Sequence, residues 1–239
     1  MKLKDLFEST GKSFADLGIE YSGGDLACNH RQLTSLEGSP KEITGDFRCN
    51  DNRLISLKGS PEVVEGSFRC DSNKLKSLMG YPKEVYVNFN CEHNLLETLT
   101  GAPKIIHGNF HCTFNRLTSL KNAPTHVMGK FACSHNELTS LEGSLERVDG
   151  DLYCAFNKLT SLKDVHKHIK EIHGEFSAIN NQIESHVLGL LLIKGINNIR
   201  LDNKQVEEIL NKHLGEGRAG MLMAQEELIE AGLEEFARL

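Results

Sequence analysis

A strict repeat of 21 residues constrains this chain more than any other feature of its sequence. The 239-residue sequence has seven cysteines, and each stands 21 residues after the previous one: Cys28, Cys49, Cys70, Cys91, Cys112, Cys133 and Cys154. A fixed period of about 20 to 29 residues indicates a solenoid, in which each coil contacts only its neighbours. The length of the chain therefore does not require two globular domains.

Alignment on the cysteines gives the pattern G-x-F-x-C-x-x-N-x-L-x-x-L-x-G-x-P-x-x-V-x. The apolar positions, the Asn and the Leu pair recur in nearly every coil, whereas the positions between them vary. Two departures stand out: Arg31 replaces the Asn of the first coil, and Val87 replaces the Gly of the fourth. We expect the turn at Val87 to differ locally. An eighth coil without cysteine, from Gly174 to Ile183, follows three inserted residues.

The core F-x-C-x-x-N-x-L-x-x-L resembles the leucine-rich repeat pattern, with Phe and Cys in its first two apolar positions. The short period and the G-x-P segment resemble the compact repeats of secreted bacterial effectors. The G-x-F-x-C pattern and the acidic helical tail are more similar to leucine-rich repeat proteins of large tailed bacteriophages. The effector repeats are often joined to a ubiquitin ligase with a cysteine nucleophile. This chain has no cysteine after Cys154, which argues against that activity.

The pattern itself predicts a parallel sheet. Phe and Cys are two residues apart and therefore lie on the same side of a strand, facing the core. The Asn column is expected to bond the backbone of the turn that follows, and the Leu pair fills the coil behind the sheet. We predict a leucine-rich repeat solenoid with a parallel β-sheet on its concave face, an extended convex side and a small α-helical C-terminal cap.

The two ends of the chain are predicted to cover the open ends of the solenoid. We expect a capping helix in residues 1–19, a solenoid of about eight coils in residues 20–184, and helices in residues 185–239. The C-terminal helices are predicted at about 185–193, 203–214 and 221–239. They are either a cap or a module that docks a partner or forms a homo-oligomer.

Composition narrows the classes of partner. The net charge of −6 argues against nucleic acid as a partner, because a surface that binds phosphates is usually basic. No apolar run is long enough for a membrane span. The N-terminal segment carries acidic residues where a secretory signal needs an apolar core. An odd number of cysteines fits a reducing compartment. We expect a cytoplasmic protein, in the host bacterial cytoplasm if it is encoded by a phage.

The cysteine column invites interpretation as a metal or redox site, but buried cysteines beside Phe and Leu behave as small apolar residues. His166, His168 and His173 crowd the insertion, yet no acid or cysteine stands beside them in a zinc-ligand pattern, and a solvated loop is the simpler interpretation. The glycine-rich segment 215–220 lacks the Lys-Ser/Thr of a phosphate-binding loop. We therefore expect no catalytic residue, no metal and no cofactor.

The variable positions are expected to form the working surface. Residues one before and two after each cysteine should face outward from the sheet, because side chains alternate along a strand. Coils two to four place charged residues there, and coils five to seven place aromatic residues, which often anchor protein interfaces. The predicted partner-binding residues are Arg48, Asp51, Arg69, Asn90, His93, His111, Phe114, His135, Tyr153 and Phe156.

We therefore expect a non-enzymatic scaffold that binds another protein through its concave face. The phage resemblance implies a host factor as partner, for example a component of an antiviral defence system that binding would inhibit. A structural or assembly role in a virion is the first alternative. A small enzyme or regulator that acts through the helical tail is the second.

Overall fold

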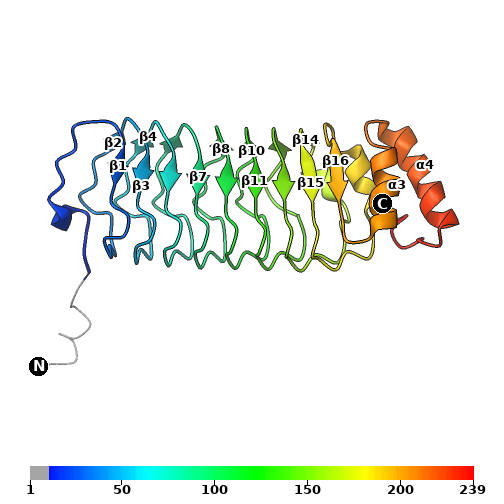
Figure 1. Cartoon of the computed structure of the whole chain (residues 1–239), viewed down its shortest axis with the longest axis horizontal. Helices are drawn as coiled ribbons and strands as arrows, with labels where there is room; N and C mark the ends of the chain where they lie inside the picture. Colours follow the sequence, from blue (N-terminus) through cyan, green and yellow to red (C-terminus); the bar gives the residue numbers. More distant parts are fainter. Residues whose placement is uncertain (1–10) are drawn as a thin grey trace, which may run out of the picture.

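The repeat builds a rod of parallel coils that ends in a group of helices (Figure 1). The structure is a computed structural model that describes residues 11–239. Within these residues, one wall of the rod is a parallel main sheet of nine strands in sequence order. The strands are β1 (Leu26–Ala27), β3 (Phe47–Arg48), β5 (Phe68–Arg69), β7 (Phe89–Asn90), β9 (Phe110–His111), β11 (Phe131–Ala132), β13 (Leu152–Tyr153), β15 (Glu175–Ser177) and β16 (Asn198–Arg200). The predicted solenoid with a helical C-terminal region is confirmed.

The opposite wall also carries strands, where we had predicted only an extended return. One sheet contains β2 (Glu42–Ile43), β4 (Val63–Val64) and β6 (Glu84–Val85). A second contains β8 (Ile105–Ile106), β10 (His126–Val127), β12 (Arg147–Val148) and β14 (Glu171–Ile172). Both walls consist of strands, so successive coils are the same distance apart on each wall. The two walls therefore have the same length along the rod, and the stack runs nearly straight in Figure 1. The surface predicted to be concave is called the main-sheet face below.

The fixed columns of the repeat fill the space between the two walls. Phe68, Cys70 and Leu75 have no exposed surface, and their equivalents in the other coils are buried in the same way. The phenylalanine rings of β3, β5, β7, β9 and β11 follow one another with centroids 5.2–5.7 Å apart. Each coil therefore buries its apolar side chains mainly against the coils before and after it, as expected for a solenoid.

The asparagine column joins neighbouring coils through buried hydrogen bonds. The Asn73 Nδ2 group donates to the carbonyl oxygens of Cys49 and Cys70, both at 3.1 Å, and its Oδ1 accepts from the Leu54 N–H at 2.9 Å. The same pattern recurs from Asn52 to Asn181. One side chain per coil thus satisfies backbone groups of two coils at the turn that leaves the main sheet.

The main sheet extends further than the predicted boundary at residue 184. Strand β16 pairs in parallel with β15, with Ile199 opposite Phe176. Its free edge is covered by α3 (Lys204–Lys212), whose Asn211 side chain accepts from the Ile199 N–H and donates to the Ile199 carbonyl, both at 2.8 Å. Asn211 therefore supplies the two hydrogen bonds that a further strand would supply, which makes α3 a cap of the sheet edge.

The predicted C-terminal helices need correction at their ends. The segment expected to form a helix at 185–193 contains the 3₁₀ helix η2 (Leu188–Leu192), because the chain must return to form β16. Helix α4 (Gly217–Glu230) stops well before residue 239, since Gly232 adopts a left-handed conformation with φ of 74°. Among the described residues, no helix has the length and apolar character needed to cross a membrane.

The N-terminal end differs from the predicted capping helix of residues 1–19, of which residues 1–10 lie outside the described part. The remainder contains only a 3₁₀ turn, η1 (Ala15–Leu17). Lys12 forms a parallel bridge with Leu33, and the Ala15 N–H donates to the Glu37 carbonyl at 3.0 Å. This segment therefore follows the course of the next coil, and its buried Phe14 covers the core.

Candidate interaction surface

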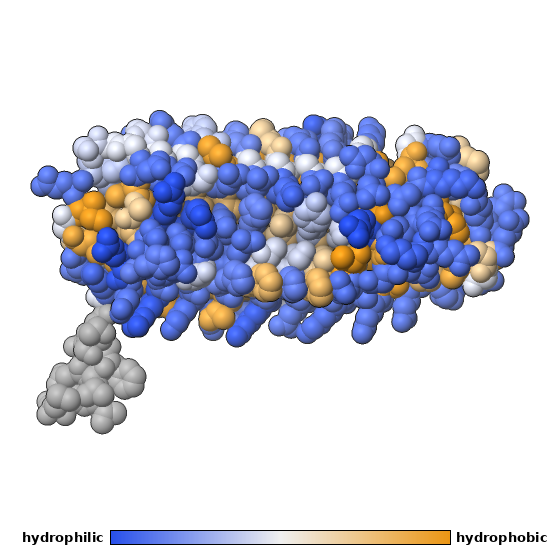
Figure 2. All heavy atoms as spheres, in the orientation of Figure 1, coloured by the Kyte–Doolittle hydropathy of each residue, from blue (hydrophilic) through white to orange (hydrophobic). Residues whose placement is uncertain are grey.

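The main-sheet face presents the residues that stand one before each cysteine. Arg48, Arg69, Asn90, His111 and Tyr153 lie at the ends of β3, β5, β7, β9 and β13, where each follows the inward-facing Phe or Leu. The preceding residue of each strand is buried, and these five side chains are exposed or half-buried. The structure thus places all five on the predicted face. Figure 2 shows that the side of the rod in view is mostly hydrophilic.

The charged half of this face is held by ion pairs within and between coils. The Arg48 guanidinium lies 2.9 Å from Asp46 and 3.1 Å from Asp25, and Arg69 lies 3.3 Å from Asp71. The Ser67 N–H and the Arg48 guanidinium hold the pKa of Asp46 below its ordinary value. These arginines are therefore already paired, and a partner would meet a network of mixed charge.

The middle of the face is built around Glu92. The Asn90 side chain donates to Glu92 at 3.2 Å, and the Thr113 hydroxyl also donates to it. The His111 Nδ1 lies 3.9 Å from Glu92. Burial lowers the pKa of His111 even though Glu92 acts in the opposite direction. His111 is accordingly a half-buried, neutral group near neutral pH.

Tyr153 marks the aromatic half of the face. Its hydroxyl donates to Asp151 at 3.0 Å, and the Lys130 ammonium lies 4.6 Å from its ring centroid. Burial and the neighbouring Asp151 raise the pKa of Tyr153 to about 12. The ring is thus fixed from two sides, and its phenol stays protonated at physiological pH.

The second column of predicted residues, two after each cysteine, does not lie in the strands as expected. The main-sheet strands of coils one to seven are only two residues long, and the Asn column turns the chain immediately after them. The residues in question lie at this corner with a left-handed backbone: φ is between 49° and 55° for His30, Asp51, Ser72, His93, Phe114, His135 and Phe156. This corner borders the main sheet, and the side chains there are exposed or half-buried.

Four of these residues form a continuous stack of rings, which we call the ladder: His93, Phe114, His135 and Phe156. The centroids of successive rings are 4.4, 4.2 and 4.3 Å apart, and the ring planes are within 10° of parallel. Phe114 and Phe156 are 45% and 46% exposed. Most ring faces are covered by the next ring, so the ladder presents ring edges and its two end faces to solvent.

Asp51 belongs to the same column but is not part of the ladder. It lies beside His30, with 3.6 Å between its carboxylate and the His30 Nε2.

The predicted site residues therefore form two groups: an ion-paired group around Arg48, Asp51 and Arg69, and an aromatic group in coils four to seven. Sequence reasoning identified the members of the ladder but not their stacking. The alternation of His and Phe at intervals of 21 residues was the available signal.

The remaining candidate groups of the sequence do not come together. The seven thiols are buried and unpaired, and burial raises their pKa, to about 12 for Cys154. His166 and His168 lie on the short helix α2 (Val165–His168), whereas His173 lies beside Glu171. Within residues 11–239, no three His, Cys, Asp or Glu side chains are arranged so that they could hold a metal ion.

Comparison with known proteins does not add to these observations. No protein-family model, curated protein sequence or solved structure matches the chain. The repeat and the geometry of its surface therefore carry the functional argument alone.

Proposed function

We propose that the chain is a non-enzymatic interaction protein that binds another protein through the ladder and the adjoining main-sheet face. The observation that carries this proposal is the backbone of Phe114 and Phe156. Both are left-handed, with φ of 53° and 51°. That conformation is uncommon for any residue other than glycine and is a true outlier for a bulky side chain.

The other coils show that the fold does not need an aromatic residue at this position. Outside the ladder, three of the four remaining coils use Asp51, Ser72 or Asn180 there, with the same backbone conformation, and the first coil uses His30. Asn and Asp are among the residues that tolerate it best. Two half-exposed phenylalanines in a strained backbone therefore call for an explanation other than packing, and strain of this kind is concentrated at functional sites.

The ladder has the properties of a binding hot spot. Its rings are large, apolar and accessible, and stacking fixes their orientation before a partner arrives. A partner would not have to immobilise them, which removes part of the entropic cost of binding. The ring edges carry partial positive charge, so carbonyl oxygens, carboxylates or the faces of aromatic side chains on the partner fit against them. The ion-paired residues around Arg48 and Arg69 would form the polar rim.

The identity of the partner rests on the sequence resemblance. Because the repeats are similar to those in leucine-rich repeat proteins of large tailed bacteriophages, a bacterial host protein is the first partner to seek. Specifically, we propose that this partner is a component of an antiviral defence system and that binding inhibits it.

We predict that alanine at Phe114, Tyr153 and Phe156 together abolishes capture of a partner. The purified wild-type protein should retain a dominant host protein from a bacterial lysate, and the triple variant should retain less than about one tenth of it, because the central anchors are removed. The measurement is quantitative mass spectrometry of the captured proteins, with thermal unfolding to show that the variant is folded.

A control uses apolar residues elsewhere on the rod that are more exposed than Phe114 and Phe156. Ile55 and Met79 are 70% and 58% exposed, and neither belongs to the ladder or the main-sheet strands. The double variant Ile55→Ala, Met79→Ala should capture the partner as the wild type does. Equal capture by the wild type and the triple variant would contradict the proposal.

A further inference from the structure

The wall opposite the main sheet is interrupted at one place, between β6 and β8. Strands β2, β4 and β6 are paired, and so are β8, β10, β12 and β14, but β6 and β8 are not. On the main sheet the same two coils remain joined: β7 pairs with β9, and the Phe89 N–H donates to the Asn109 carbonyl at 2.9 Å. We call this one-sided interruption the seam.

The seam is visible in the backbone hydrogen bonds. In the coil after it, the N–H groups of residues 125, 126, 128 and 129 donate to carbonyls of Lys104, Ile106 and Gly108. Within residues 11–239, the equivalent N–H groups of residues 104, 105, 107 and 108 make no backbone bond to the preceding coil. The Val87 N–H likewise lacks the bond to Gly66 that its position predicts, whereas the Tyr86 N–H keeps its bond to Val64 at 3.1 Å.

Val87 provides the physical cause. It occupies the column in which the other coils have glycine, and from Gly45 onwards those glycines lie directly against the previous coil. A Cβ atom added to Gly66 would lie 2.5 Å from the Gly45 carbonyl carbon, and one added to Gly129 would lie 2.8 Å from that of Gly108. Both distances are too short for a real side chain. Val87 does have a Cβ, so its segment cannot take the place that glycine takes. The Val87 N–H therefore loses its bond to the preceding coil, and β6 loses its pairing with β8.

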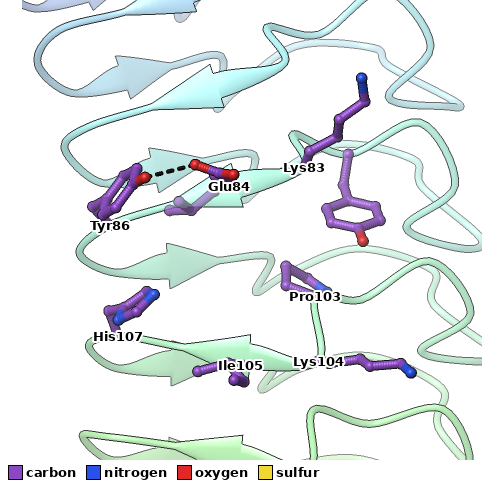
Figure 3. Close-up of a pocket in the computed structure, with 9 residues that line it drawn as sticks. Lys83, Glu84, Tyr86, Pro103, Lys104, Ile105 and His107 are labelled. Carbon is purple, nitrogen blue, oxygen red and sulfur yellow. Dashed lines mark hydrogen bonds between the residues drawn. The ribbon is translucent and has the colours of Figure 1, made fainter.

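The seam opens into a groove of about 640 Å³. Figure 3 shows its wall, where Tyr86 and Glu84 of one coil are joined by a hydrogen bond and lie opposite His107 and Ile105 of the next. That hydrogen bond is 2.6 Å long, and the rings of Tyr86 and His107 are stacked with centroids 5.7 Å apart. Side-chain contacts therefore bridge the coils where backbone bonds do not.

We propose that the seam is a hinge, at which the two halves of the rod rock about the intact strand pairing between β7 and β9. A wall without backbone bonds can open and close, while the paired wall keeps the coils in register. The hinge divides the main-sheet face: Arg48 and Arg69 lie on one side of it, and Phe114 and Phe156 lie on the other. Because His93 and Phe114 lie on opposite sides of the hinge, rocking would change the contact between the first two rings of the ladder. It would also change the position of Arg48 and Arg69 relative to Phe114 and Phe156. The hinge itself does not depend on partner binding.

The first test is hydrogen exchange of single amides by NMR. In the wild type, the amides of residues 104, 105, 107 and 108 should exchange at least about tenfold faster than those of residues 125, 126, 128 and 129, because only the second set is bonded. Val87→Gly should slow the first set to the rates of the second. Val87→Ala, which keeps the Cβ, should leave them fast. Equal rates in the wild type, or equal effects of the two substitutions, would overturn the proposal.

The second test measures the motion itself. Spin labels on Lys41→Cys and Lys104→Cys lie three coils apart across the seam. Labels on Lys104→Cys and Lys170→Cys lie three coils apart without crossing it. All three lysines are exposed, whereas the natural cysteines are buried. The distance distribution of the first pair should be broader than that of the second, and Val87→Gly should narrow it. Distributions of equal width in the wild type would show a rigid rod and contradict the hinge.

Discussion

Raising the pH above 9 is expected to unfold this protein, and the cysteine column is the reason. Burial raises the pKa of every thiol in the column above the ordinary value of 9.0, to about 12 for Cys28 and Cys154. A thiol whose pKa is higher in the folded protein stabilises the fold below pH 9. It loses this contribution as the pH rises from 9 towards 12, because only the unfolded chain can then release the proton.

The expected effect is large because seven thiols act together. At pH 10, one unit above the ordinary value, each buried thiol costs about 1.4 kcal/mol of stability. Seven of them remove roughly 10 kcal/mol, which is comparable with the total stability of an ordinary domain. We therefore expect cooperative unfolding near pH 10, monitored by circular dichroism, together with the appearance of thiolate absorbance in the ultraviolet.

The dependence of the unfolding free energy on pH separates this cause from others. Above pH 9 its slope should correspond to the release of about seven protons on unfolding. In the variant Cys91→Ala, Cys112→Ala, the slope should fall by about two protons, whatever the cost of the two cavities. A slope that is unchanged in this variant, or native thiols that react readily with a thiol reagent at pH 8, would show that the column is accessible and the explanation wrong.

Replacing Asn115 with alanine is expected to destabilise the protein strongly, because its side chain bonds backbone groups of two adjacent coils. The Asn115 side chain accepts from the buried Leu96 N–H at 3.0 Å and donates to the carbonyls of Cys91 and Cys112, both at 3.1 Å. Neighbouring asparagines also donate to these carbonyls, but the Leu96 N–H would have no partner. We expect a loss of about 2 to 4 kcal/mol in the free energy of unfolding, measured with urea.

Asn29→Ala is the matched control. Asn29 lies one residue after Cys28, is half-buried, and its side chain makes no hydrogen bond within the described residues. Its replacement should change stability by less than about 0.5 kcal/mol. If Asn115→Ala were no more costly than Asn29→Ala, the asparagine column would not be what holds the turns of adjacent coils together.

The fixed columns of the repeat were sufficient to predict the main sheet, its register and the buried core. Each of these columns has one physical task, and 21-residue spacing leaves little freedom for any other arrangement. The extra strand β16 was not predictable in this way, because Ile199 and Leu201 replace the Phe and Cys that identify a coil, and the spacing from β15 is 23 residues. Length and apolar character alone do not distinguish such a strand from a helix.

The variable columns were only partly predictable. Alternation of side chains correctly placed Arg48, Arg69 and Tyr153 on the main-sheet face. It failed for Phe114 and Phe156, because alternation holds only within a strand and the chain has already turned at these residues. The break at Val87 was expected locally from its missing glycine. Its consequence, the loss of pairing between β6 and β8, depends on how closely the other glycines approach the preceding coil.

The central claim is that the aromatic residues of the ladder are present for recognition and not for stability. The measurement that tests it most directly is the unfolding free energy of the double variant Phe114→Asn, Phe156→Asn. Asn tolerates the left-handed backbone, so relief of strain should offset the lost stacking, and the variant should remain within about 1 kcal/mol of the wild type. A loss of several kcal/mol would show instead that the ladder holds the coils together, and would contradict the account.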